Sequence, residues 1–281
     1  MSTVRLGDAL GEAQQRVDPV DARVLLSHVT GRNAAYLVAH REALLSGAQA
    51  AAYRGLVERR VAGEPVAYLT GEREFYGRPF TVTPAVLIPR PETELLVDLA
   101  LERIPKAGAA RILDLGTGSG CVAIAVASER SHLRILATDQ SLDALAVARR
   151  NAYVLAVGNV SFLHSDWYSA LGDESFDVIV SNPPYVAAAD PHLERGDLRF
   201  EPRAALAAGW DGLDCIRTIV SGGIEHLVSG GWLMVEHGHD QAHAVRALFA
   251  TAGYGDVFSE RDLAGIERVT GGRLTASDPS R

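Results

Sequence analysis

The spacing of apolar residues divides the chain into a helical first part and an alternating second part. Within residues 1–62 apolar residues recur at helical intervals in two sets, which are Val20, Val24 and Leu25, then Leu56, Val57 and Val61. This is the period of amphipathic helices, whose apolar faces pack together. We therefore expect a small bundle of four or five helices in this region.

Helix-terminus signals support two of these helices. Asp18 followed by Pro19 is typical of an N-cap with proline at the first helical position, and Gly31 stands where a glycine ends a helix. Ser46 with Gln49 three residues later has the spacing of a capping box. The pattern predicts one helix that starts at Pro19 and another that starts directly after Ser46.

A segment rich in glycine and proline separates the two parts of the chain. The stretch GEPVAYLTGEREFYGRP is followed by FTVTPAVLIP, which alternates like an edge strand or a hairpin. We therefore divide the chain into a helical domain over residues 1–75, a linker with a hairpin over residues 76–90, and a larger domain over residues 91–281.

Strands and helices alternate in the larger domain. Five apolar strands are predicted, over residues 111–115, 133–139, 160–164, 176–181 and 232–237. Residues 255–260 and 266–270 form two more strands, and the connection between them is too short for a helical crossover, so they must pair antiparallel. The pattern predicts an α/β fold with a seven-stranded doubly wound sheet that ends in an antiparallel hairpin.

Composition and charge narrow the class of protein. The 281 residues are 47% hydrophobic and 22% charged, which is typical of a globular protein. The net charge of −8 argues against a protein that holds nucleic acid mainly by neutralising phosphates. The first residues lack the apolar run of a signal peptide, and no stretch is long enough to span a bilayer. We expect a cytoplasmic protein that binds neither nucleic acid directly nor a membrane.

A glycine-rich loop follows the first strand of the larger domain. The sequence DLGTGSG lies between a strand and a helix, where glycines let a nucleotide approach the backbone and the helix offers free N–H groups. The next strand ends in Asp139, 21 residues after Gly118, where a carboxylate can accept hydrogen bonds from both ribose hydroxyls. The candidate cofactor-binding residues of the loop are Asp114, Gly116, Thr117, Gly118, Ser119 and Gly120.

The spacing within the loop distinguishes between nucleotides. The order G-x-G-x-G departs from the dinucleotide fingerprint, and Asp114 precedes the first glycine by two residues. A carboxylate there is unfavourable beside a pyrophosphate but suits the ammonium group of S-adenosylmethionine. After the third strand, Asp166 can accept a hydrogen bond from the adenine amine, and Trp167 can cover the ring. These features favour S-adenosylmethionine over NAD.

The fourth strand delivers a candidate acceptor site, Asn182-Pro183-Pro184-Tyr185. Methylation of a planar nitrogen requires that an NH₂ group be recognised and held with its lone pair toward the methyl group. The Asn182 side chain and the Pro183 backbone each offer a carbonyl acceptor, and Tyr185 can pack against a planar amide or base. We expect Asn182, Pro183 and Tyr185 to be catalytic, and all four residues to hold the substrate.

The motifs GEPVAYLTGEREFYG, VLIPRPETE, DLGTGSG, NPPY and EPRAALAAGWDGL, in this order, resemble the HemK family of protein-(glutamine-N5) methyltransferases, which modify peptide chain release factors. The resemblance runs from about residue 63 to the final strand. It implies a class I methyltransferase fold, an N-terminal domain that binds the release factor, and a metal-free site. It also implies that Asn182 contacts the cofactor, that S-adenosylmethionine is converted to S-adenosylhomocysteine, and that the acceptor is the glutamine of the release factor's Gly-Gly-Gln loop.

Three alternatives remain open. The NPPY motif also occurs in DNA adenine and RNA guanine methyltransferases, which the acidic larger domain disfavours. A non-catalytic nucleotide-binding or RNA-binding module would not need Asn182 together with the glycine loop. An NAD-dependent oxidoreductase is disfavoured by the glycine spacing. The sequence also leaves open the oligomeric state, the relative orientation of the domains, and the roles of Arg90 and Thr93.

Overall fold

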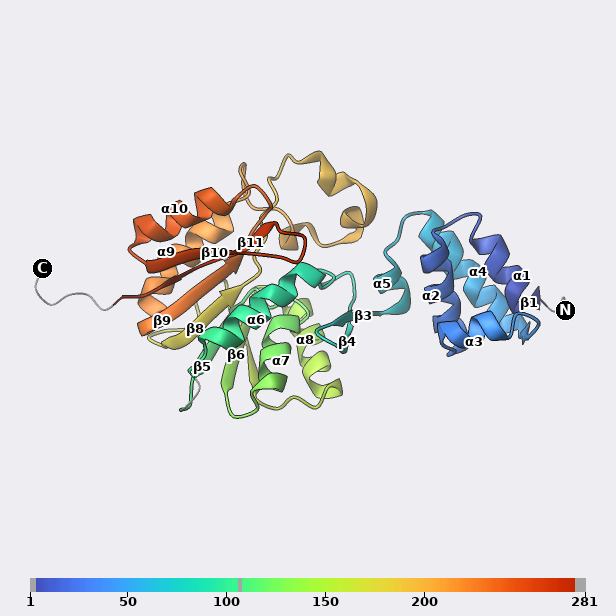
Figure 1. The fold of residues 1–281 in the computed structure, drawn as a ribbon, viewed down its shortest axis with the longest axis horizontal. Helices are drawn as coiled ribbons and strands as arrows, with labels where there is room; N and C mark the ends of the chain where they lie inside the picture. Colours follow the sequence, from blue (N-terminus) through green and yellow to red (C-terminus); the bar gives the residue numbers. More distant parts are fainter. Residues whose placement is uncertain (1–3, 106–107, 276–281) are drawn as a thin grey trace, which may run out of the picture. The chain divides into compact units, whose positions relative to one another are not determined.

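The computed structural model describes residues 4–105 and 108–275, which divide into two compact units (Figure 1). The first unit comprises Met1–Glu72 together with the short segment Arg195–Phe200, and the second comprises the rest of the chain. The sequence predicted a boundary at residue 75 and did not predict that the segment packs with the first unit. The outermost residues of the predicted domains, 1–3 and 276–281, lie outside the described residues.

Five helices and a short pair of strands form the described part of the first unit. They are β1 (Val4–Arg5), α1 (Leu6–Ala13), α2 (Pro19–Thr30), α3 (Ala34–Ala39), β2 (Leu44–Leu45), α4 (Gly47–Val61) and α5 (Val66–Thr70), with β1 antiparallel to β2. The predicted caps are confirmed. The Asp18 side chain accepts a hydrogen bond from the Val20 N–H, Gly31 adopts the left-handed conformation, and Ser46 forms a capping box with Gln49.

The buried face of α2 differs from the one that the apolar spacing predicted. Leu25 is buried as expected, but its buried neighbours are Ala22 and Leu26, whereas Val20 and Val24 are exposed. The small side chain at position 22 lets α4 approach closely, and the buried Tyr53 of α4 donates its hydroxyl to the Ala22 carbonyl at 3.0 Å. Packing between helices therefore selected the buried face, and two valines remain at the surface.

Arginine side chains hold the segment Arg195–Phe200 in the first unit. The Arg60 guanidinium donates to Asp21 Oδ2 at 2.7 Å and to Asp197 Oδ1 at 2.9 Å, so it joins α2 to the segment. Arg199 lies against Gly63, where a Cβ atom would clash with its guanidinium. Gly63 also has a φ of +95°, which favours glycine, so both packing and backbone conformation disfavour a side chain at this position.

A seven-stranded sheet forms the centre of the second unit. Its strands are β5 (Arg111–Leu115), β6 (Arg134–Asp139), β7 (Val160–His164), β8 (Phe176–Ser181), β9 (Leu227–Glu236), β10 (Gly255–Arg261) and β11 (Glu267–Arg273). The order is β10-β11-β9-β8-β5-β6-β7; β5 to β9 run parallel, and β11 is antiparallel to both of its neighbours. The predicted sheet with its antiparallel terminal hairpin is confirmed, although β9 begins five residues before the predicted start at Trp232.

Helices cover both faces of this sheet (Figure 1). They are α6 (Glu94–Arg103), α7 (Cys121–Glu129), α8 (Leu142–Val154), α9 (Asp214–His226) and α10 (Ala242–Ala252), with 3₁₀ turns at Pro91–Thr93, Pro191–Glu194 and Arg203–Ala205. A further 3₁₀ turn, Gly196–Phe200, belongs to the first unit. Alternate residues of β5 point to opposite cores: Ile112 packs with α6 and α7, whereas Leu113 packs with α9 and α10. The sheet is thus buried on both sides.

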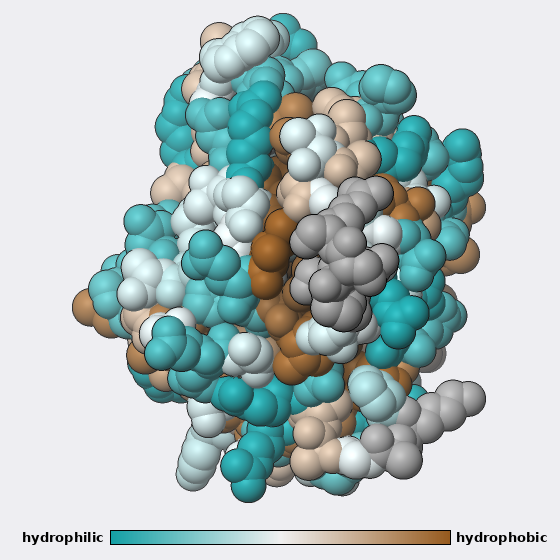
Figure 2. All heavy atoms as spheres, turned by 90° about the vertical axis from the view of Figure 1, so that its left-hand side faces the viewer, coloured by the Kyte–Doolittle hydropathy of each residue, from teal (hydrophilic) through white to brown (hydrophobic). Residues whose placement is uncertain are grey.

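The surface is mainly hydrophilic on the face drawn in Figure 2, where hydrophobic residues form a narrow band between polar ones. Most large apolar side chains are instead buried, in one cluster of the first unit and two of the second. Within the described ranges, none of the helices combines the length and apolar character that crossing a bilayer requires.

A buried asparagine connects three parts of the second unit. The short strands β3 (Glu72–Phe75) and β4 (Arg78–Thr81) form the hairpin, which lies earlier than the predicted residues 76–90. Asn151 of α8, 1% exposed, exchanges hydrogen bonds with the Thr81 N–H at 2.8 Å and the Thr81 carbonyl at 3.0 Å. It also donates to the Ser119 carbonyl at 2.8 Å. One amide thus ties α8 to the hairpin and to the glycine loop.

Replacing this amide tests its structural role. Asn151→Ala removes three hydrogen bonds and leaves buried backbone groups unpaired, so we expect the unfolding free energy of the second unit to fall by about 2–4 kcal/mol. All three tryptophans, Trp167, Trp210 and Trp232, belong to this unit, so tryptophan fluorescence in a urea titration reports its unfolding. The control is Tyr153→Ala on the same helix, 87% exposed. Equal effects of the two substitutions would contradict the assignment.

Candidate active site

A cavity of about 340 Å³ lies where the parallel strands of the second unit end at their carboxyl edge. Its size is in the range of sites for small ligands. Of the predicted site residues, the cavity is lined by Asp114, Gly116, Thr117, Gly118, Ser119, Asp139, Asp166, Trp167, Asn182 and Pro184. Gly120, Pro183 and Tyr185 do not line it. Residues that the sequence placed at four different strand ends therefore meet in one cavity.

Asp139 holds the glycine loop in place at the end of β6. Its Oδ2 accepts a hydrogen bond from the Gly118 N–H at 2.9 Å, and its Oδ1 accepts one from the Ser141 N–H at 2.8 Å. Burial raises the pKa of this carboxyl, and the backbone N–H groups oppose the rise. A carboxylate oxygen can accept more than one hydrogen bond, so both oxygens are still able to accept ribose hydroxyls.

Asp114 places a second carboxyl inside the cavity wall. It is 2% exposed, and its Oδ2 accepts hydrogen bonds from the Thr117 hydroxyl at 2.6 Å and the Ala123 N–H at 3.2 Å. Burial raises the pKa of Asp114 to about 6. A cation bound beside it would stabilise the charged form, so the residue suits the ammonium group of an amino acid.

Trp167 lies over the glycine loop in a strained backbone conformation. Its φ is +47°, which is rare for a bulky residue and costs free energy. The Ser165 hydroxyl donates to the Trp167 carbonyl at 2.8 Å and so fixes the turn. A Cβ atom at Gly116 would lie 3.5 Å from the indole, so the ring contacts the loop across a glycine. The strain at Trp167 was not predicted, but its place in the cavity wall is where an adenine-binding residue was expected.

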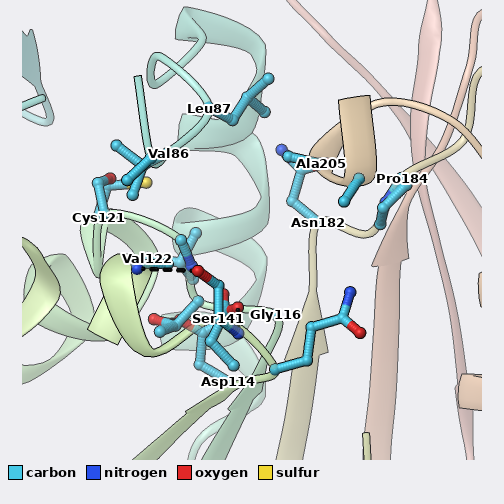
Figure 3. A pocket seen from close by; sticks show the side chains of 18 of the residues that line it. Val86, Leu87, Asp114, Gly116, Cys121, Val122, Ser141, Asn182, Pro184 and Ala205 are labelled. Carbon is cyan, nitrogen blue, oxygen red and sulfur yellow. Dashed lines mark hydrogen bonds between the residues drawn. The ribbon is translucent and has the colours of Figure 1, made fainter. Parts of the chain in front are cut away.

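The other side of the cavity carries the NPPY segment. Figure 3 shows Val86 and Cys121 on one side of the cavity and Asn182, Pro184 and Ala205 on the other. Burial raises the pKa of the Cys121 thiol to about 12, so this residue is an inert part of the wall.

Asn182 has one satisfied and one free end. Its Nδ2 donates to Thr93 Oγ1 at 3.0 Å. Its Oδ1 is buried and has no hydrogen-bond partner among the described residues. Because a buried carbonyl normally has a partner, this oxygen is available for a ligand that brings an N–H group.

Tyr185 is not among the residues that line the cavity. Its ring packs against the core beneath α9 and α10, and its hydroxyl donates to Glu236 Oε1 at 3.2 Å. Burial raises the pKa of this hydroxyl far above its ordinary value. The expected contacts of Pro183 and Tyr185 with substrate therefore stay predictions, and the structure assigns the Tyr185 hydroxyl to Glu236.

Two buried carboxyl groups near the cavity were not predicted. Glu201, 6% exposed, accepts a hydrogen bond from the Ile88 N–H at 3.0 Å and forms an ion pair with Arg90, so it fixes the cavity wall at residues 88–90. Glu236 is 1% exposed. The sequence could have indicated Glu236, because this carboxylate ends an otherwise apolar strand. A carboxylate at the start of an exposed loop would give the same pattern, so the sequence alone does not distinguish the two.

Comparisons with known proteins agree with this architecture. Residues 93–196 match the methyltransferase small domain, and residues 5–71 match the PrmC N-terminal domain. The chain is 53% identical over 264 residues to the release factor glutamine methyltransferase of Burkholderia pseudomallei, covering 92% of this chain and 93% of that protein. It is 49% identical over 269 residues to the Escherichia coli protein of the same name, and the match covers 95% of this chain and 97% of that protein.

Solved structures show the same fold at low identity. The catalytic domain of hMettl16 in complex with an RNA hairpin aligns with a TM-score of 0.58 and 15% identity, over 86% of this chain and 87% of that one. The 16S rRNA N2 G1207 methyltransferase of Thermus thermophilus, in complex with AdoMet and guanosine, aligns with a TM-score of 0.52 and 20% identity. The alignment covers 72% of this chain and 49% of that one. These likenesses concern the fold alone.

Removing the Asp139 carboxylate tests the cofactor end of the cavity. Asp139→Ala deletes the acceptors for ribose hydroxyls, and we expect binding of S-adenosylmethionine to weaken by about 1.5–3 kcal/mol, the scale of charge-assisted hydrogen bonds. Isothermal titration calorimetry measures the change, with the thermal melting curve as a check on the fold. Asp143→Ala, an exposed carboxylate in the first turn of α8, is the control. An unchanged dissociation constant for Asp139→Ala would remove this residue from the site.

Proposed function

The chain belongs to the release factor glutamine methyltransferase family, and we propose that its reaction takes place in the cavity at the ends of β5, β6 and β8. The enzyme transfers a methyl group from S-adenosylmethionine to the side-chain amide nitrogen of a release factor glutamine. The observation that carries the location is Asn182 Oδ1, a buried acceptor in the wall of that cavity that has no hydrogen-bond partner among residues 4–105 and 108–275. The proposed acceptor is the glutamine of the Gly-Gly-Gln loop.

The cavity residues divide between the parts of the cofactor. Asp139 would accept the ribose hydroxyls, Asp166 and Trp167 would hold the adenine, and Asp114 would face the ammonium group. The wall fits this ligand because its carboxylates match the donors of the cofactor, and because Gly116 and Gly118 bring the loop backbone to the cavity without side chains. S-adenosylmethionine, when bound, supplies an electrophilic methyl group.

Positioning of the substrate amide is the main task of the acceptor side. An amide nitrogen is a poor nucleophile, because its lone pair is delocalised into the carbonyl. Asn182 Oδ1 and the Pro183 carbonyl would each accept one N–H of the glutamine, which fixes the direction of the nitrogen and increases its electron density. Such positioning can contribute about 7–11 kcal/mol in favourable cases. The proton leaves after methyl transfer, when the methylated nitrogen is acidic.

The first unit is proposed to bind the release factor. It matches the PrmC N-terminal domain, and residues 1–62 carry eight arginines against six acidic residues in an otherwise acidic chain. Val20 and Val24 lie exposed one helical turn apart on α2 and offer an apolar contact. We expect a protein substrate in the cytoplasm and no direct binding of nucleic acid.

The direct test is incubation with labelled S-adenosylmethionine and purified release factor, with DNA and RNA as parallel acceptors. Label in the release factor, located on the glutamine by mass spectrometry, supports the proposal. Label in nucleic acid but not in the release factor would refute it.

Asn182 substitutions test the acceptor role. Asn182→Ala removes the free acceptor, and we expect single-turnover methylation to fall by about 100-fold or more, comparable to loss of a group that stabilises the transition state. Asn182→Asp should also fail, because its charge changes amide recognition although an acceptor remains. Melting temperatures should stay nearly unchanged. Near-wild-type rates in either folded variant would show that the assigned role is wrong.

The docking role of the first unit predicts a difference between substrates. A peptide that carries only the Gly-Gly-Gln loop should be a poor substrate, because binding energy remote from the chemistry is lost. Val20→Ser combined with Val24→Ser should raise KM for the intact factor and leave peptide methylation unchanged. Val154→Ser, exposed on α8 of the second unit, is the control. Equal efficiency on peptide and intact factor would contradict docking at a second site.

A further inference from the structure

Two buried side chains stand behind Asn182. Strands β8 and β9 are parallel neighbours in which Ser181 is opposite Val235, so Asn182 and Glu236 occupy equivalent positions one residue further. Thr93, from the 3₁₀ turn before α6, contacts both residues. Its Oγ1 accepts a hydrogen bond from Asn182 Nδ2 at 3.0 Å, and interaction with its hydroxyl lowers the pKa of the Glu236 carboxyl. Glu236 Oε2 is buried and has no hydrogen-bond partner among the described residues, so this oxygen is open to the Thr93 proton. Thr93 and Glu236 are each 1% exposed.

The protons of this group determine which way the Asn182 amide faces. The two ends of a carboxamide have nearly the same shape, so only their hydrogen-bond partners distinguish them. A threonine hydroxyl has a single proton. If Thr93 gives that proton to the Glu236 carboxylate, its oxygen can only accept, and it must face the NH₂ end of Asn182. The carbonyl end, Oδ1, is then left for another donor.

We propose that Thr93 and Glu236 are positioning residues that keep Asn182 Oδ1 turned toward the substrate amide. The carboxylate of Glu236 takes the Thr93 proton, and Thr93 in turn holds Asn182 Nδ2. The glutamine amide offers N–H donors, so it is complementary to Oδ1, whereas the reversed Asn182 amide would set one NH₂ group against another. This inference rests on the proposed role of Asn182 in holding the substrate.

The charge of Glu236 is part of this arrangement. A protonated Glu236 can itself donate to Thr93, whose hydroxyl is then able to donate to Asn182 Oδ1 and to stabilise the reversed amide. Burial raises the pKa of Glu236 to about 7, and the hydroxyls of Thr93 and Tyr185 oppose that rise. The titratable and charged groups that act on or respond to Glu236 are Glu92 before α6, Cys121 of α7, Tyr185 after β8 and Arg268 of β11.

Two matched substitutions separate positioning from packing. Thr93→Val preserves the shape of the side chain and removes the hydroxyl, whereas Thr93→Ser preserves the hydroxyl. Single-turnover methylation of intact release factor should fall by about tenfold or more in Thr93→Val, equivalent to ~1.4 kcal/mol, with KM for the factor within about twofold. Thr93→Ser should recover most of the rate. Thr218→Val, at an exposed position of α9, should behave as wild type.

The pH profile tests the carboxylate. At saturating cofactor and substrate, the wild-type rate should rise with pH through about pH 7 as Glu236 loses its proton, because only the charged form holds Thr93 as an acceptor. Glu236→Gln cannot lose a proton in this range, so its rate should be lower than the wild-type plateau and flat across the same pH values. A simple packing role would leave the shape of the profile unchanged.

Nuclear magnetic resonance observes the amide directly. The chain contains four asparagines, so selective ¹⁵N-asparagine labelling gives four side-chain NH₂ signals, and Asn182→Ala assigns the relevant one. Its protons should be protected from solvent exchange in the wild type and lose that protection in Thr93→Val.

The outcomes distinguish this inference from the function on which it rests. A wild-type enzyme that leaves the release factor glutamine unmethylated overturns the proposed function. An active wild type overturns the positioning role alone in three cases: the Thr93→Val rate stays within about twofold, Glu236→Gln retains the wild-type pH profile, or the Asn182 NH₂ protection does not change.

Discussion

The register of the parallel strands is the constraint on which the site depends. Leu115 of β5 lies opposite both Thr138 of β6 and Ser181 of β8, and Ser181 in turn lies opposite Val235 of β9. The residues that directly follow these four positions therefore lie side by side at the edge of the sheet; they are Gly116, Asp139, Asn182 and Glu236. A shift of one strand by one residue would also turn its side chains to the opposite face. Cofactor and acceptor groups meet because four hydrogen-bonded strands end in one row.

This edge of the sheet carries polar groups that folding alone does not favour. The carboxyl groups of Asp114 and Glu236 are buried, and their pKa values are raised because the charged form is poorly solvated there. Asn151 and Asp139 tie the glycine loop to α8 and β6 through hydrogen bonds with the loop backbone. The loop is therefore held before a ligand arrives, while Asn182 Oδ1 retains an unused acceptor.

Local signals predicted the parts of the structure that depend on neighbouring residues in sequence. The Ser46 capping box, the glycine loop and the antiparallel closing hairpin all followed from residues a few positions apart. The buried face of α2 did not follow, because the contact of Tyr53 with Ala22 joins residues 31 positions apart. Segment 195–200 likewise joins the first unit through an ion pair between Arg60 and Asp197, which are distant in the sequence, and apolar spacing does not record such a contact.

The same distinction explains the acceptor site. The NPPY motif identified which residues stand at the end of β8, but a motif does not state where each side chain points. Tyr185 and Asn182 are three residues apart, yet the first is bonded to Glu236 and the second reaches the cavity wall. Tyr185 donates directly to the Glu236 carboxyl, whereas Asn182 donates to Thr93, which we propose gives its own proton to the same carboxyl. A reaction without a strong base depends on the direction of one lone pair. The residues that orient its acceptor therefore matter as much as those that touch the substrate, and they come from strands and turns that no single motif spans.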